Sequence, residues 1–120
     1  MLCLHGAPKR VALFTAATLA ILSFVSLAAE AADPMIYEIT LKDQTFTPAE
    51  LKVPAGTPFI IKVKNENDAP AEFESKDMKL EKLVAGHAEI LAKVKALPGG
   101  TFEFYDEYHE DTARGAVVSE

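Results

Sequence analysis

The segment TFEFYDEYHEDTARG, residues 101–115, gathers four carboxylates around one imidazole: Asp106, Glu107, Glu110, Asp111 and His109. Its first residues alternate between aromatic and polar side chains, which is typical of a β-strand with one face buried in a core. If Phe102 and Phe104 face that core, the period of two turns the side chain of Asp106 inward as well, at the end of the strand. A carboxylate in that position costs free energy unless backbone donors, a cation or a metal compensates its charge.

A second acidic pair lies in the segment PAEFES, where Glu72 and Glu74 are two residues apart and point to the same side of an expected strand. The two segments together supply the candidate ligands of a metal ion: Glu72, Glu74, Asp106, Glu107 and His109. This set is rich in oxygen and has a single imidazole, a combination that suits iron, zinc, manganese or copper(II). Because it contains no thiolate, it is poorly suited to copper(I).

Each of these features also has a simpler interpretation. An acidic loop is most often only solvated, and Glu72 and Glu74 are equally typical of a strand face that points into water. The candidate ligands match no compact metal-binding motif. His87, in an expected turn, is interpreted as a surface residue and Met78 as a core residue, while Arg114 would screen the neighbouring acids.

The N-terminal residues have the order of an export signal. A pair of basic residues precedes the uncharged apolar run VALFTAATLAILSFVSLA, residues 11–28, and small residues follow up to Ala31. We therefore expect a signal peptide over residues 1–31, cleaved after Ala31, and one mature domain over residues 32–120 in the periplasm. The alternative is an uncleaved membrane anchor, because the apolar run is long for a signal peptide. Contact with the membrane would then come only through this segment.

The composition of the mature domain excludes several classes of partner and site. Cleavage after Ala31 changes the formal net charge from −6 to −7, because the removed segment carries two basic residues and one acidic residue. This charge argues against nucleic acid and anionic lipid as partners. The only cysteine, Cys3, lies in the signal, so the mature domain would have no disulfide, iron–sulfur cluster or thiolate ligand. No arrangement of the Ser-His-Asp or Cys-His type stands out, so no catalytic residue is predicted.

The dominant hydrophobic period of the mature domain is two, which predicts an all-β fold. The segments MIYEITLK and FIIKVKN alternate between apolar and polar side chains, and turn signals such as VPAGTP, NENDAP and LPGG separate the alternating segments. Residues 78–97 predict two further strands, although a short helix there is the alternative. Strands of this length and spacing predict a β-sandwich of about seven strands.

Two longer motifs give the chain a family resemblance. The pattern F-x-P-x-x-L-x-V-x-A-G over residues 46–56 and the segment PGGTFEFY over residues 98–105 resemble the cupredoxin-like domains of bacterial periplasmic proteins. The match is closest to the EfeO-type domains and to the small cupredoxin subunits of ferrous-iron uptake systems. The resemblance extends over about residues 36–119 and implies a Greek-key β-sandwich with a metal site at one end.

The same resemblance assigns family positions to individual residues, and several of these residues depart from the family pattern. Asp106 stands where blue-copper relatives have the cysteine ligand, Ala113 where they have the axial methionine, and Ala71 where they have a histidine. The EfeO-type domains have a cysteine at the position of Phe46 and favour an acidic residue near Glu72. His109 matches the loop histidine. These departures imply a site that is not type 1 blue copper.

The resemblance implies a periplasmic metal-binding protein that holds iron, copper or both and assists iron acquisition. The implied partner is a periplasmic iron-binding protein or an iron permease. Two alternatives stay open at this point, a metal-free β-sandwich that serves as an interaction module and a copper-handling periplasmic protein. The ligand types also leave ferroxidase-like activity undecided.

Overall fold

The computed structural model describes residue 6 and residues 33–120, which form nine β-strands and one short 3-10 helix. The elements are β1 (Met35–Lys42), β2 (Thr45–Thr47), β3 (Glu50–Val53), β4 (Phe59–Asn65), β5 (Ala71–Ser75), β6 (Leu80–Val84), β7 (Glu89–Val94), β8 (Gly100–Asp106), η1 (Glu107–His109) and β9 (Arg114–Ser119). The predicted signal peptide, its cleavage after Ala31 and the alternative anchor lie outside these residues. Within the described part of the chain, no helix reaches the length and apolarity that crossing a membrane would require.

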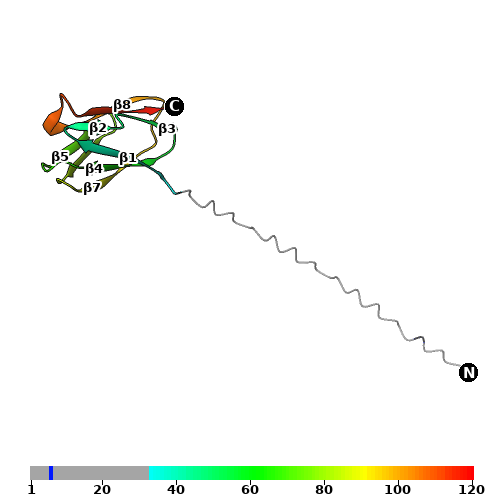
Figure 1. Ribbon diagram of the computed structural model, residues 1–120. Coiled ribbons are helices and arrows are strands. Elements are labelled where there is room, and N and C mark those ends of the chain that lie inside the picture. Colours follow the sequence, from blue (N-terminus) through cyan, green and yellow to red (C-terminus); the bar gives the residue numbers. More distant parts are fainter. Residues whose placement is uncertain (1–5, 7–32) are drawn as a thin grey trace, which may run out of the picture. The chain divides into compact units, whose positions relative to one another are not determined.

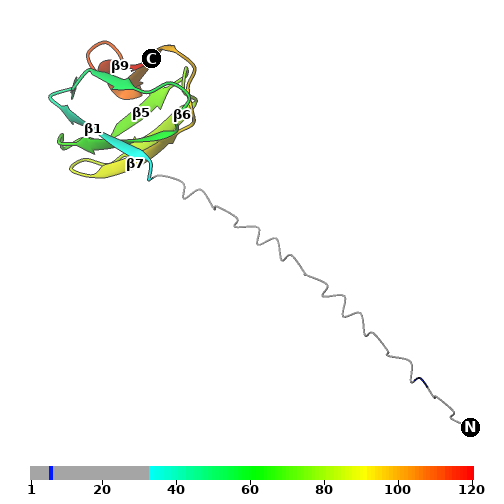
Figure 2. The ribbon, with the colours of Figure 1, turned by 90° about the vertical axis from the view of Figure 1, so that its right-hand side faces the viewer.

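The strands form two sheets that pack face to face as a β-sandwich (Figures 1 and 2). One sheet has the order β2-β1-β4-β7 and the other the order β3-β9-β8-β5-β6. Both sheets are mixed, because β1 pairs with β4 and β3 pairs with β9 in parallel, whereas the other pairs are antiparallel. The all-β sandwich expected from the alternation is confirmed. The number of strands exceeds about seven because residues 45–53 include the two short strands β2 and β3.

The core between the sheets follows the alternation of the sequence. In β4 and β5 every second side chain is buried, and the side chains between them are only partly covered. Three phenylalanines occupy the centre, and the rings of Phe46, Phe73 and Phe104 lie with centroids 5.2–6.1 Å apart. Each such aromatic contact contributes roughly 0.5–1.5 kcal/mol beyond the area that it buries. This cluster fixes β5 against β8, and these two strands carry the candidate ligands Glu72, Glu74 and Asp106.

Residues 78–97 form β6 and β7, so the two predicted strands are confirmed and the helix alternative is wrong. β6 forms the edge of one sheet and β7 the edge of the other, so the turn between them crosses from one layer to the other. Gly86 lies in this turn, and a Cβ atom there would come within 2.0 Å of the carbonyl oxygen of Asp68. Only glycine allows this approach. Met78 is buried in the core, as expected.

Several loops meet at one end of the sandwich and are held together by Asn65. This buried side chain donates hydrogen bonds to the carbonyl oxygens of Ala69, Val84 and Ala85, which joins the β4–β5 loop to the end of β6. The backbone N–H of His87 donates to the carbonyl of Asn67 in the same loop. The loop that contains η1 lies at this end as well, beside Ala71 at the start of β5.

Candidate metal centre

The carboxylate of Asp106 points into the sandwich, as the strand period predicts, and the residue is only 1% exposed. Its Oδ1 accepts hydrogen bonds from the backbone N–H groups of Glu72, at 3.0 Å, and of Tyr108, at 3.1 Å. Its Oδ2 lies 3.0 Å from Nδ1 of His109. Donors from the chain therefore satisfy both oxygens, which offsets the desolvation of the buried carboxylate without a metal ion. Asp106 is also the N-cap of η1, and this role explains its place at the end of β8.

His109 presents an imidazole at the end of the sandwich. With Nδ1 bonded to Asp106, Nε2 is the ring nitrogen that remains for a ligand, and the side chain is 32% exposed. The ring lines an open hollow of about 490 Å³, whose other ionisable side chains are Asp43, Asp68 and Asp106. A carboxylate that holds the second nitrogen of a histidine is the usual support of a histidine metal ligand. Nε2 of His109 is thus oriented as one nitrogen ligand at this end of the sandwich.

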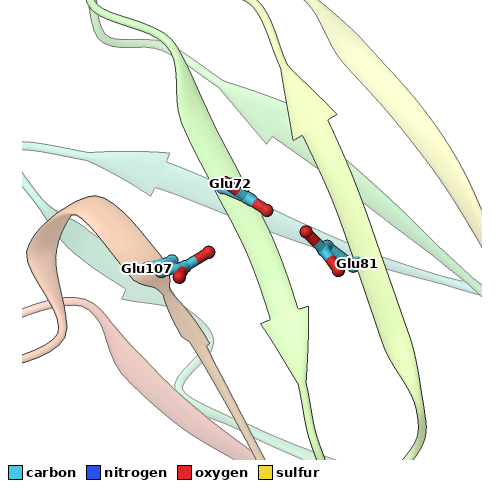
Figure 3. Close-up of side chains that lie close together, drawn as sticks. All are labelled: Glu72, Glu81 and Glu107. Carbon is cyan, nitrogen blue, oxygen red and sulfur yellow. The ribbon is translucent and has the colours of Figure 1, made fainter.

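A second group of ligand atoms lies on the outer face of the β5–β6 hairpin, and we call it the carboxylate cluster: Glu72, Glu81 and Glu107. Carboxylate oxygens of these three residues lie within 4.8 Å of one another. Figure 3 shows the three side chains converging from three elements, since Glu72 belongs to β5, Glu81 to β6 and Glu107 to η1. The hairpin and η1 can hold three oxygen ligands in this arrangement because all three side chains project from the same face.

The charges of the carboxylate cluster strongly affect one another. The charges of Glu72 and then Glu74, followed by desolvation, raise the pKa of Glu107 to about 7. A hydrogen bond with Glu72 and the charge of Glu72 raise the pKa of Glu81. Each carboxylate disfavours ionisation of its neighbours, and a cation among them would reverse this effect. The arrangement can therefore exchange protons for a cation.

The structure does not bring the five predicted ligands into one site. Asp106 and His109 lie at the end of the sandwich, whereas the side chains of Glu72 and Glu107 lie on the outer face. The predicted convergence of Glu72 with Asp106 and His109 is wrong, since only the backbone of Glu72 contacts Asp106 while its side chain leaves the other face of β5. Glu74, also on the outer face, adjoins the carboxylate cluster through its charge.

Glu81 belongs to the carboxylate cluster but was not among the predicted ligands. Glu81 is the cross-strand partner of Glu74, in a hairpin where Ser75 pairs with Leu80. The signal in the sequence is the turn SKDMKL between the two acidic segments, since the register of a hairpin follows from its turn. His87 forms an exposed pair with Asp68 and lies outside both groups, in agreement with its interpretation as a surface residue.

A sequence model described as the cupredoxin-like domain matches residues 14–119. The chain belongs to this cupredoxin-like family. Among curated proteins, an uncharacterized protein of Rickettsia prowazekii (strain Madrid E) is 36% identical over 81 residues, which are 68% of this chain and 65% of that protein. The chain thus spans just under two thirds of the length of this relative.

Solved structures share the cupredoxin fold at low sequence identity. Auracyanin A, a "blue" copper protein from Chloroflexus aurantiacus, is 17% identical and superposes with a TM-score of 0.63, covering 73% of this chain and all of auracyanin. The metal-binding domain of the Cu(I)-exporting P-type ATPase CopA from Streptococcus pneumoniae D39 is 14% identical, with a TM-score of 0.62, and covers 71% of this chain and 84% of that domain. At these identities the likeness establishes the fold.

The residues at the copper positions of the cupredoxin family do not fit type 1 copper here. Asp106 is buried with both carboxylate oxygens already hydrogen-bonded to the chain. Ala71 and Ala113 are buried and offer no donor atom in their side chains. Residues 33–120 also contain no cysteine. Without the thiolate and the thioether, His109 is the single family-type ligand that this end of the sandwich retains.

Proposed function

We propose that this cupredoxin-like protein binds a hard metal cation, iron in the first place, through the carboxylate cluster and carries it as cargo. The observation that supports the proposal is the convergence of three carboxylates within 4.8 Å of one another. Carboxylate oxygens favour hard cations over copper(I). The choice of iron follows from the resemblance of residues 46–56 and 98–105 to the EfeO-type domains.

The cargo role extends to iron acquisition outside the cytoplasm. The export signal predicted over residues 1–31 supports a periplasmic location, where the protein would meet iron before a transporter does. An exposed site on the outer face of a sheet suits handover, because a partner can reach the ligands directly. The partner in this proposal is a periplasmic iron-binding protein or an iron permease.

A second candidate function is the binding of copper(II) or iron at the end of the sandwich. The pair of Asp106 and His109 favours it, because the buried carboxylate orients the imidazole and leaves Nε2 for a metal. Two of the proteins that share the fold, auracyanin A and the metal-binding domain of CopA, are described as copper proteins, which favours copper as the metal. The protein would then handle copper rather than iron.

Calorimetric titration shows which of the two candidate sites binds a metal. The titrants are iron(II) under anaerobic conditions, manganese(II) and copper(II). We expect a variant with Glu72→Gln, Glu81→Gln and Glu107→Gln to lose iron(II) binding by about a hundredfold or more, since three charged ligands disappear. His109→Ala and the control Glu50→Gln, which changes an exposed glutamate of β3, should bind iron(II) like the wild type. Loss of binding in His109→Ala alone would move the site to the end of the sandwich. No binding by the wild type would favour the metal-free interaction module.

A further inference from the structure

The outer face of the β5–β6 hairpin combines four carboxylates with two exposed apolar side chains, and we call it the acidic face: Glu72, Glu74, Glu81, Glu107, Leu83 and Tyr108. The register of the hairpin places Leu83 opposite Glu72 and Glu81 opposite Glu74. Tyr108 follows Glu107 in η1, and burial and then the charge of Glu72 raise the pKa of its phenol. The carboxylates and the apolar groups therefore share one surface.

The acidic face lacks the ion pairs that the opposite face of the sandwich has. On the outer face of the β1–β4–β7 sheet, Lys62 pairs with Glu38 and Glu89, and Lys64 pairs with Glu38. None of the ion pairs within residues 33–120 involves a carboxylate of the acidic face. Like charges directly opposite on paired strands, as in Glu74 and Glu81, destabilise a sheet. The chain thus keeps an unbalanced negative surface at some cost to stability.

A metal ion in the carboxylate cluster explains only part of this surface. A divalent ion balances at most two negative charges of the four carboxylates and leaves the apolar side chains uncovered. Leu83 is 63% exposed and Tyr108 is 52% exposed. They flank Glu72, and Leu83 belongs to β6, the edge strand of its sheet. Exposed apolar groups next to charged groups are typical of a surface that a protein partner covers.

We propose that the acidic face is the docking surface for a protein partner that presents lysine or arginine side chains around an exposed apolar residue. The basic groups meet the four carboxylates, and the apolar residue covers Leu83 and the ring of Tyr108. Docking in this way needs no bound ion, so the proposal goes beyond cation binding. It also places the partner next to the carboxylate cluster, from which it could take or supply a cation.

A peptide titration tests this proposal. The purified protein is titrated with defined peptides in a chelating buffer, and NMR monitors the binding. The first peptide carries three lysines and two leucines in a glycine-serine background, the second replaces its leucines with serine, and the third replaces its lysines with glutamate. We expect saturable shifts at the acidic face with the first peptide and binding at least about fivefold weaker with each of the others. Leu83→Ala and Glu74→Gln should each lower the affinity for the first peptide by about fivefold.

The controls are matched substitutions elsewhere on the sandwich. Leu91→Ala removes a leucine of β7 that is 52% exposed, and Glu50→Gln removes an exposed carboxylate of β3, so both should leave peptide affinity unchanged. Equal affinity for the lysine-leucine and lysine-serine peptides, equal losses in the controls, or no saturable shift would overturn the docking proposal. Iron titrated without peptide is measured separately. If the protein binds iron but no peptide, the docking proposal is refuted and the proposed function is not. If it binds peptide but no iron, only the proposed function is refuted.

Discussion

Glu107 is the side chain through which pH acts most directly on the carboxylate cluster. Its pKa of about 7 arises mainly from the charges of Glu72 and Glu74, so near neutral pH it carries a proton part of the time. A cation competes with that proton for the same oxygens. Cation binding should therefore strengthen as the pH rises through about 7, where Glu107 becomes ionised.

The raised pKa of Glu107 also predicts how the stability of the metal-free protein depends on pH. An ordinary glutamate has a pKa of 4.5, so between that value and about 7 the folded state binds more protons than the unfolded state. The stabilisation from this proton is complete below pH 4.5 and is lost as the pH rises through about 7. We expect Glu107→Gln to increase the free energy of unfolding at pH 8 and to flatten its fall between pH 5.5 and pH 8.

Urea unfolding of the two proteins at both pH values, in the presence of a chelator, checks this expectation. Glu50→Gln is the control, because it removes an exposed glutamate outside the carboxylate cluster. If Glu107→Gln and the wild type lost stability equally between the two pH values, the crowding of charge around Glu107 would be disproved.

At the scale of the elements, alternation predicts the strands well because burial has the same period as the sequence. The buried faces of β1 and β4, the inward turn of Asp106 and the two strands between residues 80 and 94 all follow from it. The position of a strand relative to its neighbours is a different kind of information, since register depends on turns and on pairing. The sequence pattern alone therefore did not show that the side chain of Glu72 lies apart from His109. It also did not show that Glu74 pairs with Glu81.

The connection between β5 and η1 depends on Asp106, whose carboxylate accepts one backbone hydrogen bond from each element. We expect Asp106→Ala to lower the free energy of unfolding by about 1–3 kcal/mol, because it leaves these partly buried donors without their acceptor. Asp106→Asn keeps an oxygen acceptor and should cost less.

Chemical denaturation of both variants measures these differences. Iron(II) titration of the same samples shows whether Asp106 has a structural role or is a metal ligand. The expected outcome is a destabilised Asp106→Ala variant that still binds iron(II) with the affinity of the wild type when folded. A variant of undiminished stability that no longer binds iron would make Asp106 a metal ligand instead of a cap.

At the scale of the whole molecule, the sandwich separates Asp106 and His109, which the family resemblance assigns to copper-ligand positions, from the carboxylate cluster. The strand period sends Phe73 and Asp106 to the inner side and Glu72 to the outer side. The two candidate sites therefore lie on different faces of the same sheet. With this arrangement the acidic surface can change without altering the inward-facing residues of the cupredoxin fold.

The central claim is that a hard cation binds to the carboxylate cluster of Glu72, Glu81 and Glu107. Anomalous diffraction at the iron absorption edge, from crystals of the protein loaded with iron(II) without oxygen, tests it most directly. We expect an anomalous peak among these three carboxylates, within about 2.0–2.6 Å of oxygens from at least two of them. A peak on Nε2 of His109 instead, or no peak in crystals whose solution counterpart binds iron, would contradict it.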